Sequence, residues 1–190
     1  MPKKITKKII EKRTTKTTAK AVKPTINTAP NIQRGGQSWV YTETVRDHFF
    51  HPRNLLSTAQ EAKYIADGVG MIGSPACGDV MKVWIKVKPV FTTEKNSTNK
   101  LTGKKILDQK KSRITECKWQ TFGCGSAISS TSMMSLMVTE KGGMSIEEAM
   151  KLKAMDINVR LGGLPTVKLH CSILGDQALK SAINDYLKKI

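Results

Sequence analysis

Residues 79–88, with the sequence DVMKVWIKVK, decide the fold because their side chains alternate in character. Apolar side chains occupy every second position, at Met81, Val83, Ile85 and Val87. Lysines fill most of the intervening positions, at Lys82, Lys86 and Lys88. A period of two is typical of a β-strand with one face on a core and one face in water. This stretch therefore predicts a strand, around which the other elements can be placed.

Two further stretches predict strands that would pair with it. Residues 69–72 form a short apolar run, and residues 113–121 place Thr115, Cys117 and Trp119 on one face. Residues 89–112 between the second and third strands are rich in Asn, Thr and Lys, and we expect a mobile hairpin insertion there. Because Cys117 shares the face of Trp119 and has no glycine or polar ligand beside it, we expect a buried, apolar cysteine.

Helical patterns flank these strands. Residues 42–50 predict a short helix ending before Pro52, and residues 126–140 predict a helix stopped by two glycines. A capping box at residues 145–148 opens a short helix through Lys153. The last helix should run from about Ser172 to Lys188, with an apolar stripe at Leu174, Ala178, Ala182, Ile183, Tyr186 and Leu187. We expect an α+β domain, with a small three-stranded antiparallel sheet and helices packed on one face.

The net charge of +17 is concentrated in two segments. Residues 1–34 carry +9 and residues 82–118 carry +8, so the rest of the chain is neutral. Both segments are poor in the aromatic side chains on which nucleic-acid bases stack, so we do not expect nucleic acid as a primary partner. A basic nucleic-acid binder is kept as a rival hypothesis. No run of 18 apolar residues occurs, so we expect no contact with a membrane through a spanning helix.

The amino-terminal residues differ in composition from the rest. Residues 1–38 are rich in Lys, Thr, Ala and Pro, and cannot bury enough apolar surface to fold alone. We expect a disordered basic extension there, either a transit peptide or a solvated tail, and a folded domain over residues 39–190. Four cysteines without a secretory signal favour a reducing compartment.

Three of the four cysteines lie in short turns of small residues, each close to another polar group. Cys77 is followed by Gly78 and Asp79, Cys124 lies between two glycines, and Cys171 follows His170. The predicted elements place Cys77 before the second strand, and Cys124 and Cys171 before helices, so the three could meet at one edge of the domain. Three thiolates, a carboxylate and an imidazole suit a zinc or iron–sulfur site, with one donor more than a four-coordinate metal needs. Residue types and spacing alone leave the choice between metal and sulfur chemistry open.

The residues around these cysteines resemble the iron–sulfur cluster scaffold family, the IscU and NifU N-terminal group. The likeness rests on PACGDVMK at residues 75–82, TFGCGSAI at 121–128 and LPTVKLHCS at 164–172. A DH pair at 47–48 followed by PRN at 52–54 also resembles that family. The resemblance covers residues 39–190 apart from 89–112.

The resemblance implies a scaffold rather than a turnover enzyme. Cys77, Cys124 and Cys171 would hold a nascent 2Fe–2S cluster built from iron, and Cys171 would accept persulfide sulfur from a cysteine desulfurase. Asp79 would be a weak ligand that keeps the cluster labile. His170 would be an alternate ligand of the cluster, or of zinc in the cluster-free form.

The resemblance also implies partners and a location. Leu164, Pro165, Thr166, Val167 and Lys168 would be recognised by an Hsp70-type chaperone working with a J-protein, although Thr166 replaces a usual second proline. Further partners would be a frataxin-like protein, a ferredoxin and apo iron–sulfur recipients. Tyr41 would be a dimer contact, in a protein that is a monomer or a homodimer. The location would be the mitochondrial matrix or a mitochondrion-related organelle, with the bacterial cytoplasm as the alternative.

Two zinc hypotheses compete with the scaffold. A zinc-dependent sulfurtransferase partner of a cysteine desulfurase is the nearer, but such relatives typically lack the histidine that His170 supplies here. A zinc hydrolase or deaminase is disfavoured because the chain has no HExxH or His-x-Glu pattern. We expect His48 and His51 to be packing and helix-end residues rather than ligands.

Overall fold

The protein is described by a computed structural model over residues 33–34, 37–38, 41–75, 78–95 and 101–190. For residues 33–34, 37–38, 95, 101–102, 167 and 169–172, only the course of the backbone is described. The strands are β1 (Gln33–Arg34), β2 (Gln37–Ser38), β3 (Gly68–Gly73), β4 (Val80–Lys88), β5 (Phe91–Lys95), β6 (Leu101–Leu107) and β7 (Arg113–Phe122). The helices are α1 (Glu43–Phe50), α2 (Thr58–Glu61), α3 (Gly125–Thr139), α4 (Ile146–Lys151), α5 (Ala154–Arg160) and α6 (Leu169–Lys189), with short 3-10 turns η1 (Glu140–Gly142) and η2 (Thr166–Lys168).

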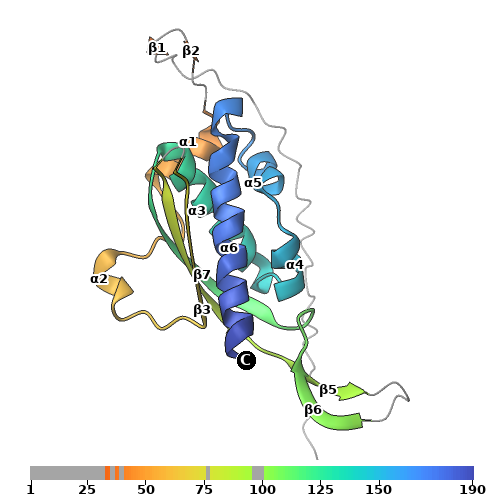
Figure 1. The fold of residues 1–190 in the computed structure, drawn as a ribbon. Helices are drawn as coiled ribbons and strands as arrows, with labels where there is room; N and C mark the ends of the chain where they lie inside the picture. Colours follow the sequence, from red (N-terminus) through yellow and green to blue (C-terminus); the bar gives the residue numbers. More distant parts are fainter. Residues whose placement is uncertain (1–32, 35–36, 39–40, 76–77, 96–100) are drawn as a thin grey trace, which may run out of the picture.

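The central sheet is antiparallel, with strand order β3-β4-β7 (Figure 1). Its three strands match the three predicted stretches. The alternation predicted for β4 is confirmed, because Met81, Val83 and Ile85 are fully buried. The predicted α+β class and the three-stranded antiparallel sheet are therefore correct.

A bulge in β7 makes one predicted face wrong. Lys86 pairs with Glu116, whereas Val87 pairs with Ile114, so Thr115 is an additional residue in β7. Thr115 is exposed, and Ile114 takes the core position instead. An inserted residue reverses the alternation of side chains on either side of it. Cys117 and Trp119, beyond the bulge, are buried as predicted.

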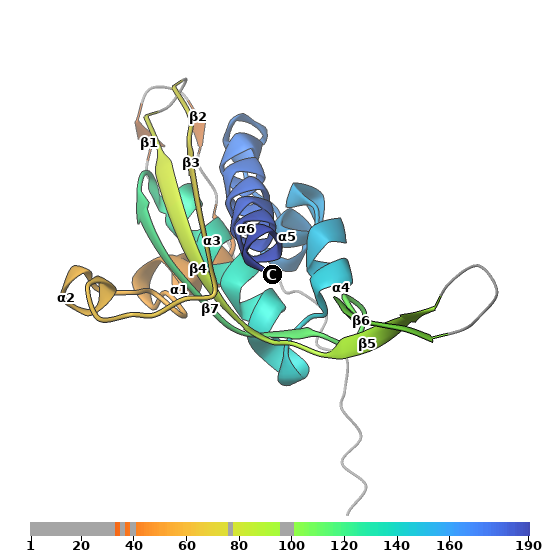
Figure 2. The same cartoon turned by 60° about the horizontal axis from the view of Figure 1, so that its bottom comes forward.

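The helices cover one face of this sheet. α6 lies over β3 and β4, and α3 lies over β7, with α1 packed on α3 and α5 on α6 (Figure 1, Figure 2). Two glycines of β3 allow α6 to approach closely. A Cβ atom on Gly68 would lie 2.3 Å from the carbonyl oxygen of Ala182, and one on Gly70 would lie 2.3 Å from that of Ala178. The helix therefore rests directly on the strand backbone, at a distance that only glycine permits.

The segment that follows α2 covers the opposite face of the sheet. The Lys82 ammonium lies 2.6 Å from a carboxylate oxygen of Glu61. The Tyr64 hydroxyl donates to Glu116 over 2.9 Å, and its ring lies 4.7 Å from the Lys86 ammonium. The lysines of β4 thus contact this segment while their ammonium groups stay accessible to water.

Helix α3 is buried on nearly all sides, yet it is lined by hydroxyl groups. Its buried side chains include Ser129, Ser130, Thr131, Ser132 and Ser135. Several of these hydroxyls donate to a carbonyl four residues earlier in the helix, at distances of 2.7–2.9 Å. Local hydrogen bonding of this kind allows a polar helix to be buried without orphaned donors.

The two histidines of α1 are packing and helix-end residues, as predicted. His48 is buried, and its Nδ1 lies 2.8 Å from the Ser132 hydroxyl. His51 is exposed and caps the carboxyl end of α1, where its backbone N–H donates to the Asp47 carbonyl.

Several helix bounds differ from the prediction. α4 ends at Lys151 rather than Lys153, because Leu152 is extended at ψ 132°. α5 was not predicted, since its seven residues bury only Ile157. α6 begins at Leu169 rather than Ser172, so Cys171 lies in its first turn and not before it. The predicted stripe of α6 is buried except at Leu187, which is half-buried.

Strands β5 and β6 form a hairpin within the predicted insertion at residues 89–112. They pair with each other and project away from the central sheet (Figure 2). The base of the hairpin is closed by two bonds, in which Asp108 N–H donates to the Val90 carbonyl and Val90 N–H donates to the Ser112 hydroxyl, both over 2.8 Å. Within the described residues, none of the helices is long and apolar enough to cross a membrane.

Candidate functional site

Asp79 and Cys124 form the described part of the candidate site. Cys124 is the N-cap residue of α3, and Asp79 directly precedes β4. Because Val80 pairs with Phe122, the ends of β4 and β7 bring these two residues together. The Cys124 thiol donates to Oδ2 of Asp79 over 3.7 Å. Asp79 is buried and Cys124 is half-buried, so the pair lies just beneath the surface.

Gly123 provides the space that the Asp79 carboxyl group occupies. A Cβ atom on Gly123 would lie 2.8 Å from Cγ and 2.9 Å from Oδ1 of Asp79. The backbone of Asp79 is also held, because its carbonyl accepts from Ser74 N–H over 2.9 Å. Gly78 N–H donates to the Ser74 carbonyl over 2.8 Å, and Gly78 has φ +73°, which favours glycine. Cys77, in the same turn, lies outside the described residues.

The amino end of α6 lies level with the turn that follows β3. Gly70 is beside Ala178 and Ala182, while Gly68 is beside Ala182 and Tyr186, so α6 runs antiparallel to β3. Three strand residues beyond Gly70 advance about 10 Å, which equals about seven helix residues. The end of β3 is therefore level with the first turn of α6, as Figure 1 shows.

That first turn contains the backbone of His170 and Cys171. Their side chains are outside what the structure describes, so their roles as ligands stay predictions. Among the residues that are described, no group of three Cys, His, Asp or Glu side chains could hold a metal ion. The structure thus brings Cys124 and Asp79 together and places the backbone of α6 beside their turn.

The chemistry of this pair depends on the proton that the Cys124 thiol donates to Asp79. A thiolate and a carboxylate side by side repel each other unless a positive charge lies between them. By contrast, Cys117 is fully buried, and burial raises the pKa of its thiol to about 12. Cys117 is therefore a buried, apolar cysteine, as the sequence predicted.

The remaining predicted residues, Tyr41 and the segment at residues 164–168, lie near α3 and α6 and make contacts of their own. The Tyr41 hydroxyl lies 3.0 Å from that of Ser126, in the first turn of α3. Leu164 is buried, and its N–H donates to the side chain of Asn158 over 2.7 Å. Thr166 and Lys168 belong to the 3-10 turn that leads into α6. The segment at residues 164–168 is thus anchored at its first residue and continues into the helix.

Exposed aromatic side chains beside the site were not predicted as functional. The Phe49 ring would contact a Cβ atom on Gly125 at 3.3 Å, and Phe50 packs edge-on against Phe49 at 4.9 Å. Phe122, immediately before Gly123, is 83% exposed. Phe49 lies one helical turn from the buried Val45, a spacing that indicated a helix but no role at the site. The sequence does contain an indication for Phe122, because this aromatic residue directly precedes the glycine-flanked turn of Cys124.

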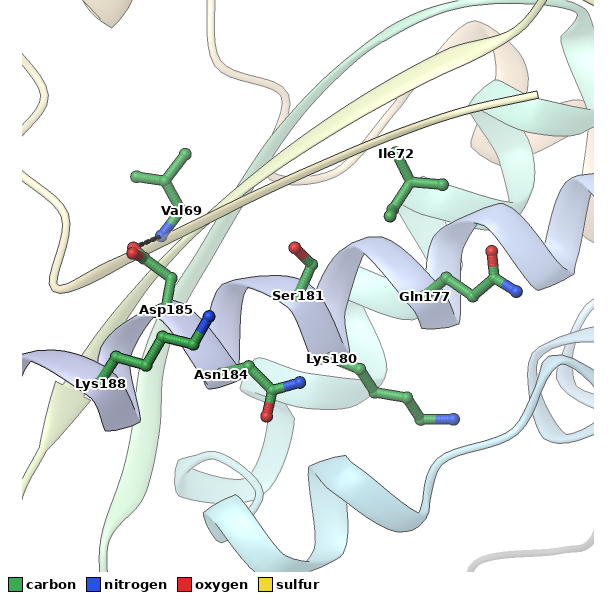
Figure 3. A pocket seen from close by; sticks show the side chains of 8 residues that line it. All are labelled: Val69, Ile72, Gln177, Lys180, Ser181, Asn184, Asp185 and Lys188. Atoms are coloured by element: carbon green, nitrogen blue, oxygen red, sulfur yellow. Dashed lines mark hydrogen bonds between the residues drawn. The ribbon is translucent and has the colours of Figure 1, made fainter. Parts of the chain in front are cut away.

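A surface groove between β3 and α6 is distinct from this site (Figure 3). Val69 and Ile72 line it from the strand, and polar side chains of α6 line it from the helix. Val69 N–H donates to the carboxylate of Asp185 over 2.8 Å. No cysteine or histidine lines the groove, so it is not a candidate ligand site.

Comparison with known proteins identifies the family. The pattern of the family described as "NifU-like N terminal domain" matches residues 40–100 and 94–190. The chain is 41% identical to the Drosophila melanogaster "Iron-sulfur cluster assembly enzyme IscU", over 79% of this chain and 80% of that protein. It is 40% identical to the Rickettsia prowazekii "Iron-sulfur cluster assembly scaffold protein IscU", over 78% and 93%.

A fungal relative agrees with this assignment, and a solved structure shares the fold. The chain is 39% identical to the Kluyveromyces lactis "Iron sulfur cluster assembly protein 1, mitochondrial", over 90% of this chain and 79% of that protein. The crystal structure of a NifU-like N-terminal protein from Brucella abortus shares the fold, with TM-score 0.50 at 14% identity, over 78% of this chain and 95% of that one. The chain therefore belongs to the NifU-like N-terminal domain family.

Proposed function

We propose that this chain is an iron–sulfur cluster assembly scaffold, which holds a nascent 2Fe–2S cluster as cargo and passes it to other proteins. The names of its relatives and its family membership support this function. The observation that carries it furthest is the contact of Cys124 with Asp79 at 3.7 Å, on strand ends level with the first turn of α6. A site of this composition holds a cluster without burying it.

The proposed ligands are Cys77, Cys124 and Cys171, with Asp79 and His170 as the additional donors. Thiolates suit iron, whereas a carboxylate in place of a fourth thiolate binds iron more weakly. Asp79 would then provide the labile position through which a cluster leaves. Cys171 would also accept persulfide sulfur from a cysteine desulfurase. Zinc in the cluster-free form would use the same donors.

The proposed partners follow from the same role. Sulfur would come from a cysteine desulfurase, with a frataxin-like protein and a ferredoxin assisting assembly. An Hsp70-type chaperone and its J-protein would recognise residues 164–168 and promote transfer to apo iron–sulfur proteins. Tyr41 is proposed as a dimer contact, which would require its bond to Ser126 to be exchanged.

The proposed location is a mitochondrion or a related organelle, with residues 1–38 as the address and residues 39–190 as the scaffold domain. A fungal relative named as mitochondrial supports this proposal. A rickettsial relative supports the bacterial cytoplasm as the alternative. In either location the chain would act as a scaffold rather than as a turnover enzyme, because it would hold and pass on the cluster without converting a substrate into a product.

Anaerobic incubation with iron, cysteine and a desulfurase tests the function. Absorption and Mössbauer spectra should show a 2Fe–2S cluster on the wild-type chain. Replacing Cys77, Cys124 or Cys171 by serine should abolish a stable cluster, while Cys117→Ala should form it normally. A zinc-bound protein that accepts persulfide sulfur but never forms a cluster would instead establish the zinc-dependent sulfurtransferase.

A further inference from the structure

The β5–β6 hairpin interrupts the pattern of the family. The family pattern matches the chain in two pieces, which overlap at residues 94–100. This overlap runs from the end of β5 to the residue before β6. The hairpin follows the end of β4 at Lys88 and projects from that end of the sheet (Figure 2), whereas Asp79 precedes the start of β4. The nine residues of β4 between them span about 30 Å, so these two parts of the molecule are well separated. The hairpin is therefore separate from the candidate site, and the family match divides in two at its tip.

Two lysines of β6 form no ion pair within the described part of the hairpin, although Glu94 lies on the neighbouring strand β5. Lys104 and Lys105 are exposed on β6, and neither forms an ion pair with any described residue. Elsewhere around the hairpin, Lys111 pairs with Asp108 at 3.4 Å and Lys110 approaches Glu147 at 3.9 Å. Lys104 and Lys105 thus present two positive charges on β6 that no described carboxylate pairs with.

The hairpin also exposes apolar side chains and main-chain groups. Phe91 is 49% exposed and Ile106 is 41% exposed. They lie on opposite faces, because Phe91 pairs with Leu107 whereas Ile106 pairs with Thr92. Within the described part of the chain, β5 and β6 form a ladder only with each other, so each leaves one edge open. An open edge presents unpaired N–H and C=O groups that another strand can bind.

We propose that the open edge of β6 binds an extended acidic segment of a partner protein by strand addition. Main-chain hydrogen bonds would supply affinity, and the charges of Lys104 and Lys105 would select a segment rich in Asp or Glu. The same lysines disfavour pairing of two copies of β6, because like charges would then meet. The edge is thus suited to an acidic strand and unsuited to its own copy.

Two other occupants fit the hairpin less well. Residues 96–100, which connect β5 and β6, read NSTNK and contain no apolar residue to insert into a membrane. Phe91 is the only aromatic residue of residues 89–112, whereas nucleic-acid surfaces use several stacking rings. The proposal does not depend on cluster assembly, because the hairpin lies outside the ligand motifs.

A labelled synthetic peptide of about eight residues that alternates glutamate with valine is the probe. Fluorescence anisotropy with the cluster-free full chain should show binding that weakens as salt is raised. The double variant K104E/K105E should bind at least about tenfold more weakly. The matched control K63E/K188E changes two exposed lysines elsewhere by the same charge, and should bind within about twofold of wild type.

Three further measurements decide between mechanisms. A peptide of equal charge with prolines in place of the central valines should fail to bind, because proline removes the N–H groups that strand pairing needs. Amide hydrogen exchange should show new protection at residues 104–107 on binding. A chain in which an Asn-Gly turn replaces residues 91–107 should not bind, and its melting temperature reports that it is folded.

The proposal is wrong if the proline peptide binds as well as the valine peptide, or if K104E/K105E and K63E/K188E lose affinity equally. Binding of anionic vesicles or single-stranded RNA that K104E/K105E abolishes, with no peptide binding, would replace the acidic strand by that ligand. Dimerisation that the shortened chain loses would assign the edge to a second copy.

Discussion

Replacing Gly123 by alanine should displace the carboxyl group of Asp79 from Cys124. The new Cβ atom would lie 2.8 Å from Cγ and 2.9 Å from Oδ1 of Asp79. Ordinary contacts between carbon atoms are about 3.5–4.0 Å, so the carboxyl group must move by about 1 Å. Gly123 is not in the left-handed region, so alanine itself adopts this backbone without strain. The thiol–carboxylate contact, already 3.7 Å long, should be lost.

The expected cost of this crowding is about 1–3 kcal/mol in the free energy of unfolding. Asp79→Ala removes the atoms that would clash, and leaves Gly123→Ala only a 3.2 Å contact with Ala127. A double-mutant cycle should therefore give a coupling energy of about 1–2 kcal/mol between positions 79 and 123. Urea unfolding of the four cluster-free proteins under reducing conditions measures it directly.

Gly125→Ala is the control for this cycle. Its Cβ atom would meet the ring of Phe49 at 3.3 Å, and that side chain is 39% exposed and able to move. We expect a small loss and no coupling to Asp79. Strictly additive effects of Gly123→Ala and Asp79→Ala would refute the packing described here. If the two substitutions are coupled as expected, Gly123→Ala displaces the Asp79 carboxyl group from Cys124. It should then slow transfer of a reconstituted cluster to apo-ferredoxin, as Asp79→Ala should.

Three further predictions concern the core. Iodoacetamide should alkylate Cys124 but not Cys117 in the folded protein, because burial raises the pKa of the Cys117 thiol to about 12, and peptide mass spectrometry should find both modified in urea. Burial lowers the pKa of His48 from its usual 6.5, so the unfolded chain binds a proton at this residue more readily than the folded protein does. The free energy of unfolding should therefore fall as pH drops below about 6.5, by at most about 1.4 kcal/mol per pH unit. The variant H48Q should show a flatter dependence on pH. Gly70→Ala would place Cβ 2.3 Å from a carbonyl oxygen of α6 and should lower the melting temperature sharply, whereas Gly73→Ala, with 3.6 Å to its nearest neighbour, should change it little.

Much of the fold follows from local patterns. The alternation in β4 and the capping box of α4 each act over a few residues, and the structure has both. The two glycines predicted to stop α3 follow a 3-10 turn instead, because the helix already ends at Thr139, before the extended Glu140. The burial of Cys117 followed from its neighbour Trp119 for the same reason.

The fold prediction is wrong where contacts with residues far away in the sequence determine the local structure. Thr115 is exposed because β4 fixes the position of the bulge, which no pattern within β7 reveals. α5 is a short helix held by packing on α6, so its own sequence carries little signal.

The candidate site shows the same division. Local motifs placed Asp79 and Cys124 at element ends, but their 3.7 Å contact depends on the pairing of Val80 with Phe122. The space at Gly123 likewise depends on a residue far away in the sequence. The ligand roles of Cys77, His170 and Cys171 stay predictions, since the structure does not describe their side chains.

The hydroxyl groups that line α3 have a calorimetric consequence. Exposing apolar surface on unfolding raises the heat capacity, whereas exposing polar surface lowers it. Because α3 buries five serine and threonine side chains from Ser129 to Ser135, beside methionines, its unfolding should add less to the heat capacity increment than that of a helix with leucines at those five positions. The increment for the folded domain should lie below the usual value of about 12–15 cal/mol/K per residue. A smaller increment broadens the curve of the free energy of unfolding against temperature. The domain should therefore undergo cold denaturation at a lower temperature than a domain of equal stability with the usual increment.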